Sequence, residues 1–215
     1  RAQLATAGNP EGEIRIVFVT HSIPTSDAQA AGPREMVAQL DTDLYSAQHL
    51  AVADAILAGV PEAAGLEHSL VFQSRSGAPH VPWLEPDIND ALTQYQAAGV
   101  AGVVVMPIGF VSDHMEVLWD LDTEAKETCA ELGLAFHRAP TPGTHATFVS
   151  GMVDLVAERL AGSDGNALKP GRASVAELGP WFDVCRPNCC VKVMRDGTTK
   201  PTIAAVDSEV GVPAS

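Results

Sequence analysis

Four short apolar runs, separated by longer segments of helical periodicity, constrain the fold of this chain more than any other feature. We expect strands at residues 14–19, 70–73, 103–106 and 134–138, and helices at about 34–58, 87–98, 112–132 and 144–160. Strands that alternate with helices are joined by right-handed crossovers, which make the strands parallel. The pattern therefore predicts an α/β fold with a parallel four-stranded sheet and helices on both faces.

The composition divides the chain into three parts. Residues 1–13 are polar and lack an initiating Met, so we expect a linker from an N-terminal half that precedes them. Residues 14–160 form the expected α/β domain. From residue 161 to residue 215 the sequence is rich in Gly, Ser, Asp and Pro, which predicts a linker and a tail.

The charge balance excludes two classes of partner. The chain has 13 basic and 27 acidic residues, a formal net charge of −14. Binding to nucleic acid or to an anionic membrane surface needs clustered Lys and Arg, so neither is expected.

The longest apolar stretch, 100–111, is too short and too rich in Gly and Pro for a membrane span. With no secretory signal in the sequence, the cytoplasm is the expected location.

Polar side chains follow the predicted strands, at the edge where parallel sheets collect their ligands. His21 comes directly after the first strand, and Arg75 follows the second, with Trp83 further along the same loop. Arg75 is suited to binding an anionic ligand, and Trp83 to walling a flat apolar pocket. Each residue taken alone also fits a plain role, as a structural histidine, a surface arginine or a packing tryptophan.

An acidic row follows the third strand. Ser112 or Asp113 is positioned to cap a helix that carries acidic residues and one histidine in its first turns: Asp113, His114, Glu116, Asp120, Asp122 and Glu124. Residues spaced by four drift about 40° per step around a helix, so Glu116, Asp120 and Glu124 form one row. Hard divalent cations prefer such oxygen ligands, and His adds a nitrogen donor or a base. A solvated helix face is the alternative interpretation.

Three cysteines lie close together in the tail, at Cys185, Cys189 and Cys190. In a protein expected in the cytoplasm, this spacing favours metal or iron–sulfur ligation over a disulfide. Three thiols complete neither a zinc site nor a [2Fe–2S] cluster. Cys129 is a formal fourth ligand, although its place in a helix pattern favours a small buried side chain.

Together these motifs resemble the C-terminal half of a ferrochelatase, the family that inserts ferrous iron into a porphyrin. The resemblance covers about residues 14–160 and includes the segments 19–24 and 73–84. Its most specific part is the block 107–124, with Ser-Asp-His-Met-Glu at 112–116. The cysteine-bearing tail is similar to that of the [2Fe–2S]-bearing actinobacterial members. For that branch the resemblance implies coproporphyrin III as substrate and coproheme as product.

The resemblance also implies roles for individual residues. His21 would face the porphyrin as a base or a metal ligand, with Glu116 as its partner carboxylate. Asp120 and Glu124 would continue a metal path along a helix with a π-type turn. We further expect substrate contacts from Arg75, Trp83 and His114.

The same resemblance implies a partner domain. Ferrochelatases hold the porphyrin between two similar α/β domains, so an N-terminal domain outside this chain would complete the pocket. That domain would also supply the fourth cluster cysteine, beside Cys185, Cys189 and Cys190.

Two other functions stay open. A cobalt or nickel tetrapyrrole chelatase is disfavoured because such enzymes typically pair two histidines at the metal. A non-catalytic metal- or iron–sulfur-binding module would handle metal without any porphyrin.

Overall fold

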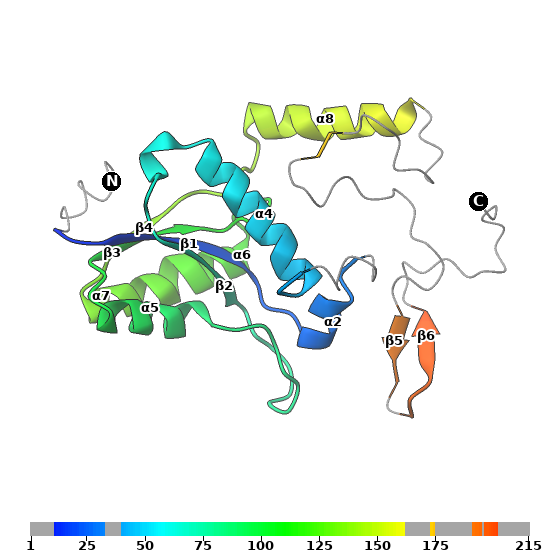
Figure 1. Ribbon diagram of the computed structural model, residues 1–215, viewed down its shortest axis with the longest axis horizontal. Coiled ribbons are helices and arrows are strands. Elements are labelled where there is room, and N and C mark those ends of the chain that lie inside the picture. Colours follow the sequence, from blue (N-terminus) through cyan, green and yellow to red (C-terminus); the bar gives the residue numbers. More distant parts are fainter. Residues whose placement is uncertain (1–10, 33–39, 162–172, 175–190, 195, 202–215) are drawn as a thin grey trace. The chain divides into compact units, whose positions relative to one another are not determined.

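The computed structural model describes residues 11–32, 40–161, 173–174, 191–194 and 196–201 (Figure 1). The chain divides into two compact units, which are described separately. The first comprises Arg1–Thr25 and His49–His145, and the second comprises Ser26–Gln48 and Ala146–Ser215. The expected domain boundaries at residues 13 and 160 stay a prediction.

A parallel sheet of four strands forms the centre of the first unit. The strands are β1 (Ile14–His21), β2 (His68–Gln73), β3 (Gly102–Met106) and β4 (Ala135–Arg138), in the spatial order β2-β1-β3-β4. All three strand pairs are parallel, which confirms the predicted α/β class. In this register His21 lies opposite Gln73 at the carboxyl end of the sheet.

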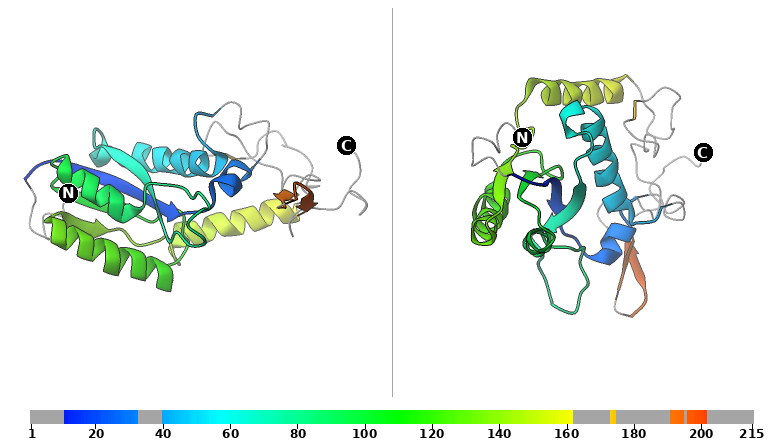
Figure 2. Two further views of the ribbon diagram at one scale, coloured as in Figure 1. Left: turned by 90° about the horizontal axis from the view of Figure 1, so that it is seen from below. Right: turned by 60° about the vertical axis from the view of Figure 1, so that its left-hand side comes forward.

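Helices cover both faces of this sheet, as predicted (Figure 2). Side chains alternate between the faces along a strand, so β1 contributes to two cores. Val17 and Val19 pack into the larger core with residues of the helices on that side, including Ile88, Leu92, Val117, Leu121 and Cys129. Ile16 and Phe18 pack on the other face against Ala53, Ile56 and Leu57.

The helix expected as one segment at residues 34–58 is not continuous, because residues 40–43 are not helical. The described residues show α2 (Thr25–Gln29) and α4 (Leu44–Ala58), while residues 33–39 lie outside the described ranges. Asp43 caps α4, since its carboxylate accepts hydrogen bonds from the backbone N–H and the hydroxyl of Ser46, both at 2.8 Å. Such a cap satisfies a backbone donor that has no partner within the helix, so the helix begins there.

The next helix agrees closely with its prediction. A short 3₁₀ turn, η1 (Pro61–Ala63), precedes β2, and α5 (Ile88–Ala97) follows it. Asp87 is the N-cap of α5, and its carboxylate accepts from the backbone N–H of Asn89 at 2.8 Å. The cap therefore fixes the helix start one residue after the predicted one.

The helix that follows β3 is made of three consecutive segments. They are α6 (Met115–Val117), the π-helix η2 (Leu118–Ala125) and α7 (Lys126–Leu132). The predicted start at Ser112 or Asp113 is wrong, because His114 is the N-cap residue and the Asp113 carboxylate binds elsewhere. The π-type turn implied by the resemblance is present, and such turns are frequent at functional sites.

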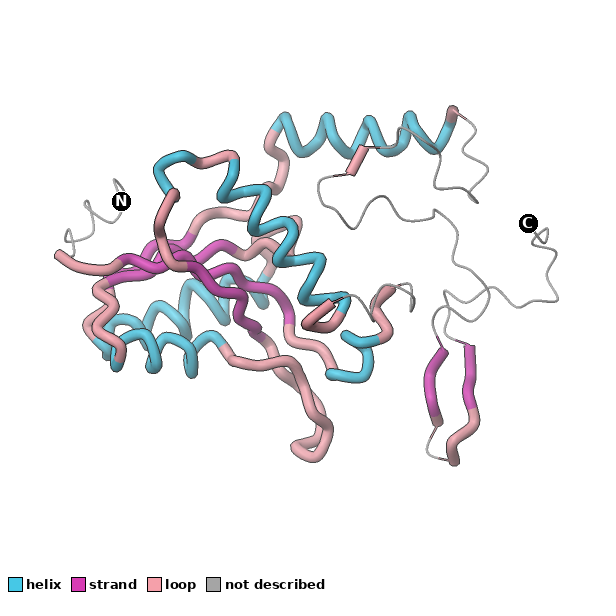
Figure 3. Tube along the Cα trace, in the orientation of Figure 1, coloured by secondary structure: helices cyan, strands magenta, loops and turns pink. Residues whose placement is uncertain are grey.

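The second unit contains α8 (Ala146–Leu160) and a hairpin of β5 (Val191–Val193) and β6 (Thr199–Pro201). The helix was predicted, whereas the antiparallel hairpin lies in the segment expected to be a tail. Figure 3 marks these elements by type and leaves the residues outside the described ranges in grey. No helix among the described residues combines the length and the apolar character needed to cross a membrane.

Candidate active site

The candidate site lies at the carboxyl edge of the sheet. His21 ends β1, Gln73 ends β2 and Arg138 ends β4, while the segment after β3 leads to Glu116. Each strand thus delivers polar side chains to the same edge. This is where open parallel sheets place their ligands.

His21 and Glu116 form a direct pair. His21 Nε2 lies 3.2 Å from Glu116 Oε1, and the two side chains keep exposed fractions of 34% and 47%. The other ring nitrogen, Nδ1, contacts the carbonyl oxygen of Ser22. A carbonyl can only accept, so Nδ1 carries the hydrogen, and Nε2 is the nitrogen directed at the carboxylate. The sequence placed these two residues on one edge, and the structure brings them into contact.

Asp120 is held by the end of β2. Its Oδ2 atom accepts a hydrogen bond from Gln73 Nε2 at 3.1 Å and another from the Ser74 hydroxyl. Gln73 is 1% exposed, and its Oε1 atom has no hydrogen-bond partner among the described residues. Ser74 adopts the left-handed conformation, with φ 61°, which directs its side chain to Asp120. These contacts fix one carboxylate oxygen of Asp120 and leave the other available.

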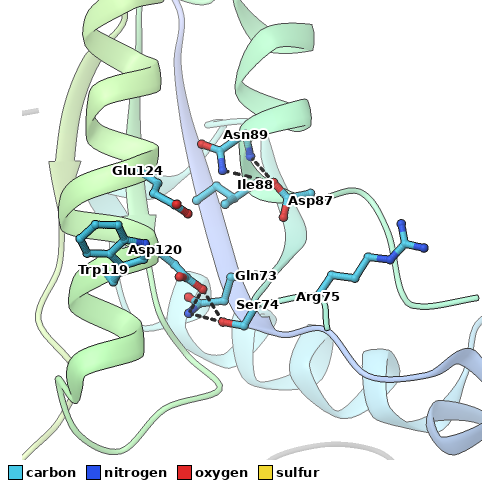
Figure 4. Close-up of a pocket in the computed structure, with 9 residues that line it drawn as sticks. All are labelled: Gln73, Ser74, Arg75, Asp87, Ile88, Asn89, Trp119, Asp120 and Glu124. Carbon is cyan, nitrogen blue, oxygen red and sulfur yellow. Dashed lines mark hydrogen bonds between the residues drawn. The ribbon is translucent and has the colours of Figure 1, made fainter. Parts of the chain in front are cut away.

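A pocket of about 270 Å³ adjoins this cluster (Figure 4). Asp120 and Glu124 point into it from the π-helix, while the opposite wall comes from the start of α5. The pocket is lined by Gln73, Ser74, Arg75, Asp87, Ile88, Asn89, Trp119, Asp120 and Glu124. Three carboxylates in one opening give it the character of a cation-attracting cavity.

The predicted metal ligands are distributed along a series. His21 and Glu116 are paired, Asp120 is bound to β2, and Glu124 is exposed on the next turn of the π-helix. Within the part of the chain that the structure describes, no group of three His, Cys, Asp or Glu side chains could hold a metal ion. The role of these four residues as metal ligands stays a prediction.

The three predicted substrate contacts lie in different surroundings. Arg75 is exposed, extends away from Asp120 in Figure 4, and lies 3.6 Å from Glu85. Trp83 is half-buried, and its ring lies against Gly77 of its own loop. His114 is exposed and makes an edge contact with Phe110. None of the three contacts His21 in the interactions described, and their substrate role stays a prediction.

The cysteines fall into two groups. Cys185, Cys189 and Cys190 lie outside the described residues. Cys129 is fully buried in α7, and burial raises the pKa of its thiol from 9.0 to about 12. A buried, protonated thiol is a poor metal ligand, because thiolate is the ligating form. This supports the expectation that Cys129 is a core residue.

Several site residues were absent from the sequence prediction. Gln73 and Ser74 were noticed only as part of a loop, and Asp122 only as part of the acidic series. Arg138 was assigned to a strand alone. The rule that placed His21, a polar residue at the carboxyl end of a buried strand, also applies to Gln73 and Arg138 and would have found both.

The fold and the site define an α/β domain with a parallel sheet that gathers a histidine and several carboxylates beyond its carboxyl edge. The ferrochelatase family model matches residues 1–160 of this chain. The chain belongs to the ferrochelatase family.

Three curated relatives are each named coproporphyrin III ferrochelatase. The one from Leifsonia xyli subsp. xyli is 50% identical over 204 residues, covering 92% of this chain and 50% of the relative. The one from Tropheryma whipplei is 46% identical over 207 residues, covering 95% and 50%. The one from Streptomyces griseus is 48% identical over 195 residues, covering 90% and 50%. The chain thus spans about half the length of the curated relatives it matches.

Proposed function

We propose that this chain handles the metal in a ferrochelatase that inserts Fe²⁺ into coproporphyrin III, giving coproheme. The observation that carries the proposal is the contact between His21 Nε2 and Glu116 Oε1, at 3.2 Å on the open carboxyl edge of the sheet. Family membership and the names of the relatives favour this reaction. The fold alone would fit many chemistries.

The His21–Glu116 pair is suited to exchanging protons for a metal ion. With the hydrogen on Nδ1, a neutral His21 presents a lone pair to a carboxylate that also presents lone pairs. The contact is therefore attractive when a proton lies between the two atoms. When that proton leaves, both atoms direct lone pairs to one point, where a pyrrole proton or an Fe²⁺ ion can bind.

Metallation requires such a base, which passes protons on to water one at a time. Insertion of one Fe²⁺ releases two pyrrole protons, so a base near the ring nitrogens accelerates the reaction. His21 accepts a proton at Nε2, and the Glu116 carboxylate stabilises the resulting imidazolium. Both side chains remain partly exposed, so the proton can pass to water.

Asp120 and Glu124 supply a route for the iron. Both line the pocket of about 270 Å³, and they follow Glu116 at intervals of four residues. Carboxylates draw Fe²⁺ into the pocket, and the unpartnered Oε1 of buried Gln73 offers a further oxygen. The ion then passes from a series of weak positions to the His21–Glu116 pair.

Exposed apolar side chains beside this pair suit a flat ring. Val111, Met115 and Leu118 flank Glu116 in the sequence, with exposed fractions of 64%, 78% and 38%. A porphyrin covers apolar surface of this kind while its centre faces the histidine. Arg75, with a 44% exposed side chain, binds one of the ring's carboxylates, and His114 and Trp83 contribute further contacts.

Two partners complete the proposed enzyme. A second α/β domain covers the porphyrin from the other side, in agreement with the greater length of the relatives. Cys185, Cys189 and Cys190 ligate a [2Fe–2S] cluster, together with one ligand from that domain. Iron and acid-labile sulfide analysis after Cys189→Ser tests the cluster, with Cys129→Ala as the control that retains it.

The decisive experiment is anaerobic loss of coproporphyrin III fluorescence on addition of Fe²⁺, in the complete enzyme. His21→Ala and Glu116→Gln are each expected to lower the rate by about 100-fold, the usual contribution of a general base. His80→Ala, in an exposed loop, is the matched control and should keep the wild-type rate. Binding of porphyrin without metallation in the wild type would contradict the proposal, and preference for Co²⁺ or Ni²⁺ would favour the alternative chelatase.

A further inference from the structure

The guanidinium of Arg138, at the end of β4, donates hydrogen bonds from all three of its nitrogen atoms. Its Nε and Nη2 atoms donate to the two carboxylate oxygens of Asp122, at 2.6 and 2.7 Å. Its Nη1 atom donates to Asp113 Oδ1 at 2.8 Å and to the carbonyl of Ala139 at 3.2 Å. The Arg138 side chain is only 12% exposed. A paired, planar and largely buried guanidinium holds its partners in fixed directions.

The loop after β4 strengthens the same connection. Asp113 Oδ1 also accepts from the backbone N–H of Thr141 at 3.3 Å, and Thr141 is 8% exposed. Two residues further, the N–H of Gly143 donates to the carbonyl of Val111 at 3.0 Å. The loop 138–143 therefore binds the turn that precedes α6 at two points.

Glu116 lies between the two carboxylates that Arg138 holds. It comes three residues after Asp113 and six residues before Asp122, across the junction of α6 and the π-helix. Fixing both flanks limits the movement of the intervening backbone. The Glu116 side chain itself makes only the contact with His21 among the hydrogen bonds of the described residues, so its position depends on that backbone.

Arg138 also neutralises some acidic residues of the series and not others. Asp113 and Asp122 each form an ion pair with it, whereas Glu116, Asp120 and Glu124 form none with an arginine or lysine among the described residues. The pKa of the Arg138 guanidinium is raised by its hydrogen bond to Asp122 and by the charges of both carboxylates, so it stays cationic. Arg138 thereby neutralises two carboxylates of the acidic series, and the negative charge of the other three remains to attract a cation.

We propose that Arg138 is a positioning residue, which holds Glu116 against His21 by fastening Asp113 and Asp122 to the end of β4. This inference rests on the proposed function for its catalytic consequence, although the geometric part stands independently. Lysine cannot replace the arginine, because a single ammonium group does not form the paired contact with Asp122. Arg138 does not touch the reacting atoms, so its effect passes through Glu116.

The geometric part is tested by the imidazole ¹⁵N NMR signals of His21 in the full chain at one fixed pH. Glu116→Gln will move the Nε2 signal, and Arg138→Gln should move it in the same direction. Arg138→Lys, which keeps the charge, should do the same if Arg138→Gln does not fold. Arg15→Gln is the control: Arg15 also forms an ion pair, with Glu13 at 2.8 Å, but at the start of β1. A wild-type His21 signal in both Arg138 variants would overturn the proposal.

The catalytic part is tested by measuring kcat and KM separately. Arg138→Lys should lower kcat for metallation by roughly 10- to 100-fold, the cost of a misplacement of about 1 Å, with KM for the porphyrin unchanged. In a Glu116→Gln background the same substitution should have little further effect. Equal additional losses in both backgrounds would overturn the positioning role. If the wild type does not metallate porphyrin, the proposed function fails, and the NMR comparison still decides the role of Arg138.

Discussion

Gly109 lies so close to Thr20 that no larger residue fits in its place. A Cβ atom added to Gly109 would lie 2.0 Å from Thr20 Oγ1 and 3.0 Å from its Cα. Thr20 is fully buried, its hydroxyl contacts His49 Nε2 at 2.9 Å, and it directly precedes His21. The segment after β3 and the end of β1 are therefore in contact at the residue that precedes His21.

Gly109→Ala is expected to lower both stability and metallation. The added methyl group must displace Thr20 or the segment carrying Gly109, and such overpacking costs typically about 1–3 kcal/mol. Because Thr20 precedes His21, the displacement also disturbs the His21–Glu116 contact. Urea unfolding and the porphyrin fluorescence assay measure the two effects.

Gly151→Ala is the matched control for this substitution. Gly151 lies inside α8, and an added Cβ there meets no atom within 4 Å. Alanine is favoured over glycine inside a helix by about 1 kcal/mol, so this variant should be slightly more stable than the wild type. Unchanged stability and activity in Gly109→Ala would show that the contact with Thr20 relaxes without cost.

Two substitutions of Ser74 separate its hydroxyl from its backbone. Ser74→Ala and Ser74→Gly both remove the hydrogen bond to Asp120, so both should raise KM for Fe²⁺ to a similar extent. The φ of 61° costs a non-glycine residue roughly 1–2 kcal/mol. Ser74→Gly should therefore be more stable than Ser74→Ala by about that amount in urea unfolding.

The comparison of the two variants is its own control. A KM for Fe²⁺ that rises in Ser74→Ala alone would assign the effect to backbone conformation and not to the lost hydroxyl. A wild-type KM for Fe²⁺ in both variants would show that the hydrogen bond from Ser74 to Asp120 has no part in the iron route.

The sequence predicted the sheet because its strands are nearly continuous apolar runs, which need no tertiary information to recognise. His21 and Glu116 could be placed on one edge for the same reason, since the carboxyl ends of parallel strands coincide. Their 3.2 Å contact could not be predicted, because it depends on how the segment after β3 turns.

The errors have a common physical cause. Ser112 and Asp113 have the side chains of N-cap residues, and local preference alone favours starting the helix there. In the folded chain Asp113 instead binds Arg138, which is 25 positions away. The paired contact of Arg138 with Asp122 likewise joins residues whose proximity only the fold establishes.

Met115→Ser is expected to weaken porphyrin binding. Met115 is 78% exposed and adjoins Glu116, so a porphyrin over the His21–Glu116 pair would cover its apolar side chain. Losing most of that burial should raise Kd by about tenfold, corresponding to about 1.4 kcal/mol. Fluorescence titration with coproporphyrin III in the absence of iron measures this affinity.

Val153→Ser is the comparison for Met115→Ser. Val153 is 60% exposed in α8, so the substitution removes a similarly exposed apolar side chain from a different element. Its Kd should equal that of the wild type. Equal Kd values in all three proteins would exclude the surface around Met115 as a porphyrin contact.

Burial of Cys129 predicts that stability decreases at alkaline pH. The pKa of this thiol is 9.0 in its ordinary state and about 12 in the fold, so the folded chain retains the proton that the unfolded chain loses. Stability falls with pH wherever the folded state binds more protons than the unfolded state. The free energy of unfolding is therefore unaffected by this thiol below pH 9, and it decreases as the pH rises from 9 toward 12. The slope from this single group approaches about 1.4 kcal/mol per pH unit.

Cys129→Ala isolates that contribution. Other groups titrate in the same range, so the quantity to measure is the difference in free energy of unfolding between variant and wild type, by urea denaturation from pH 7 upward. The variant starts less stable, because alanine leaves a small cavity in the core around Leu121 and Leu134. The difference should shrink above pH 9, because only the wild type must keep a thiol protonated. A constant difference across this range would mean that the Cys129 thiol ionises as readily in the fold as in the unfolded chain.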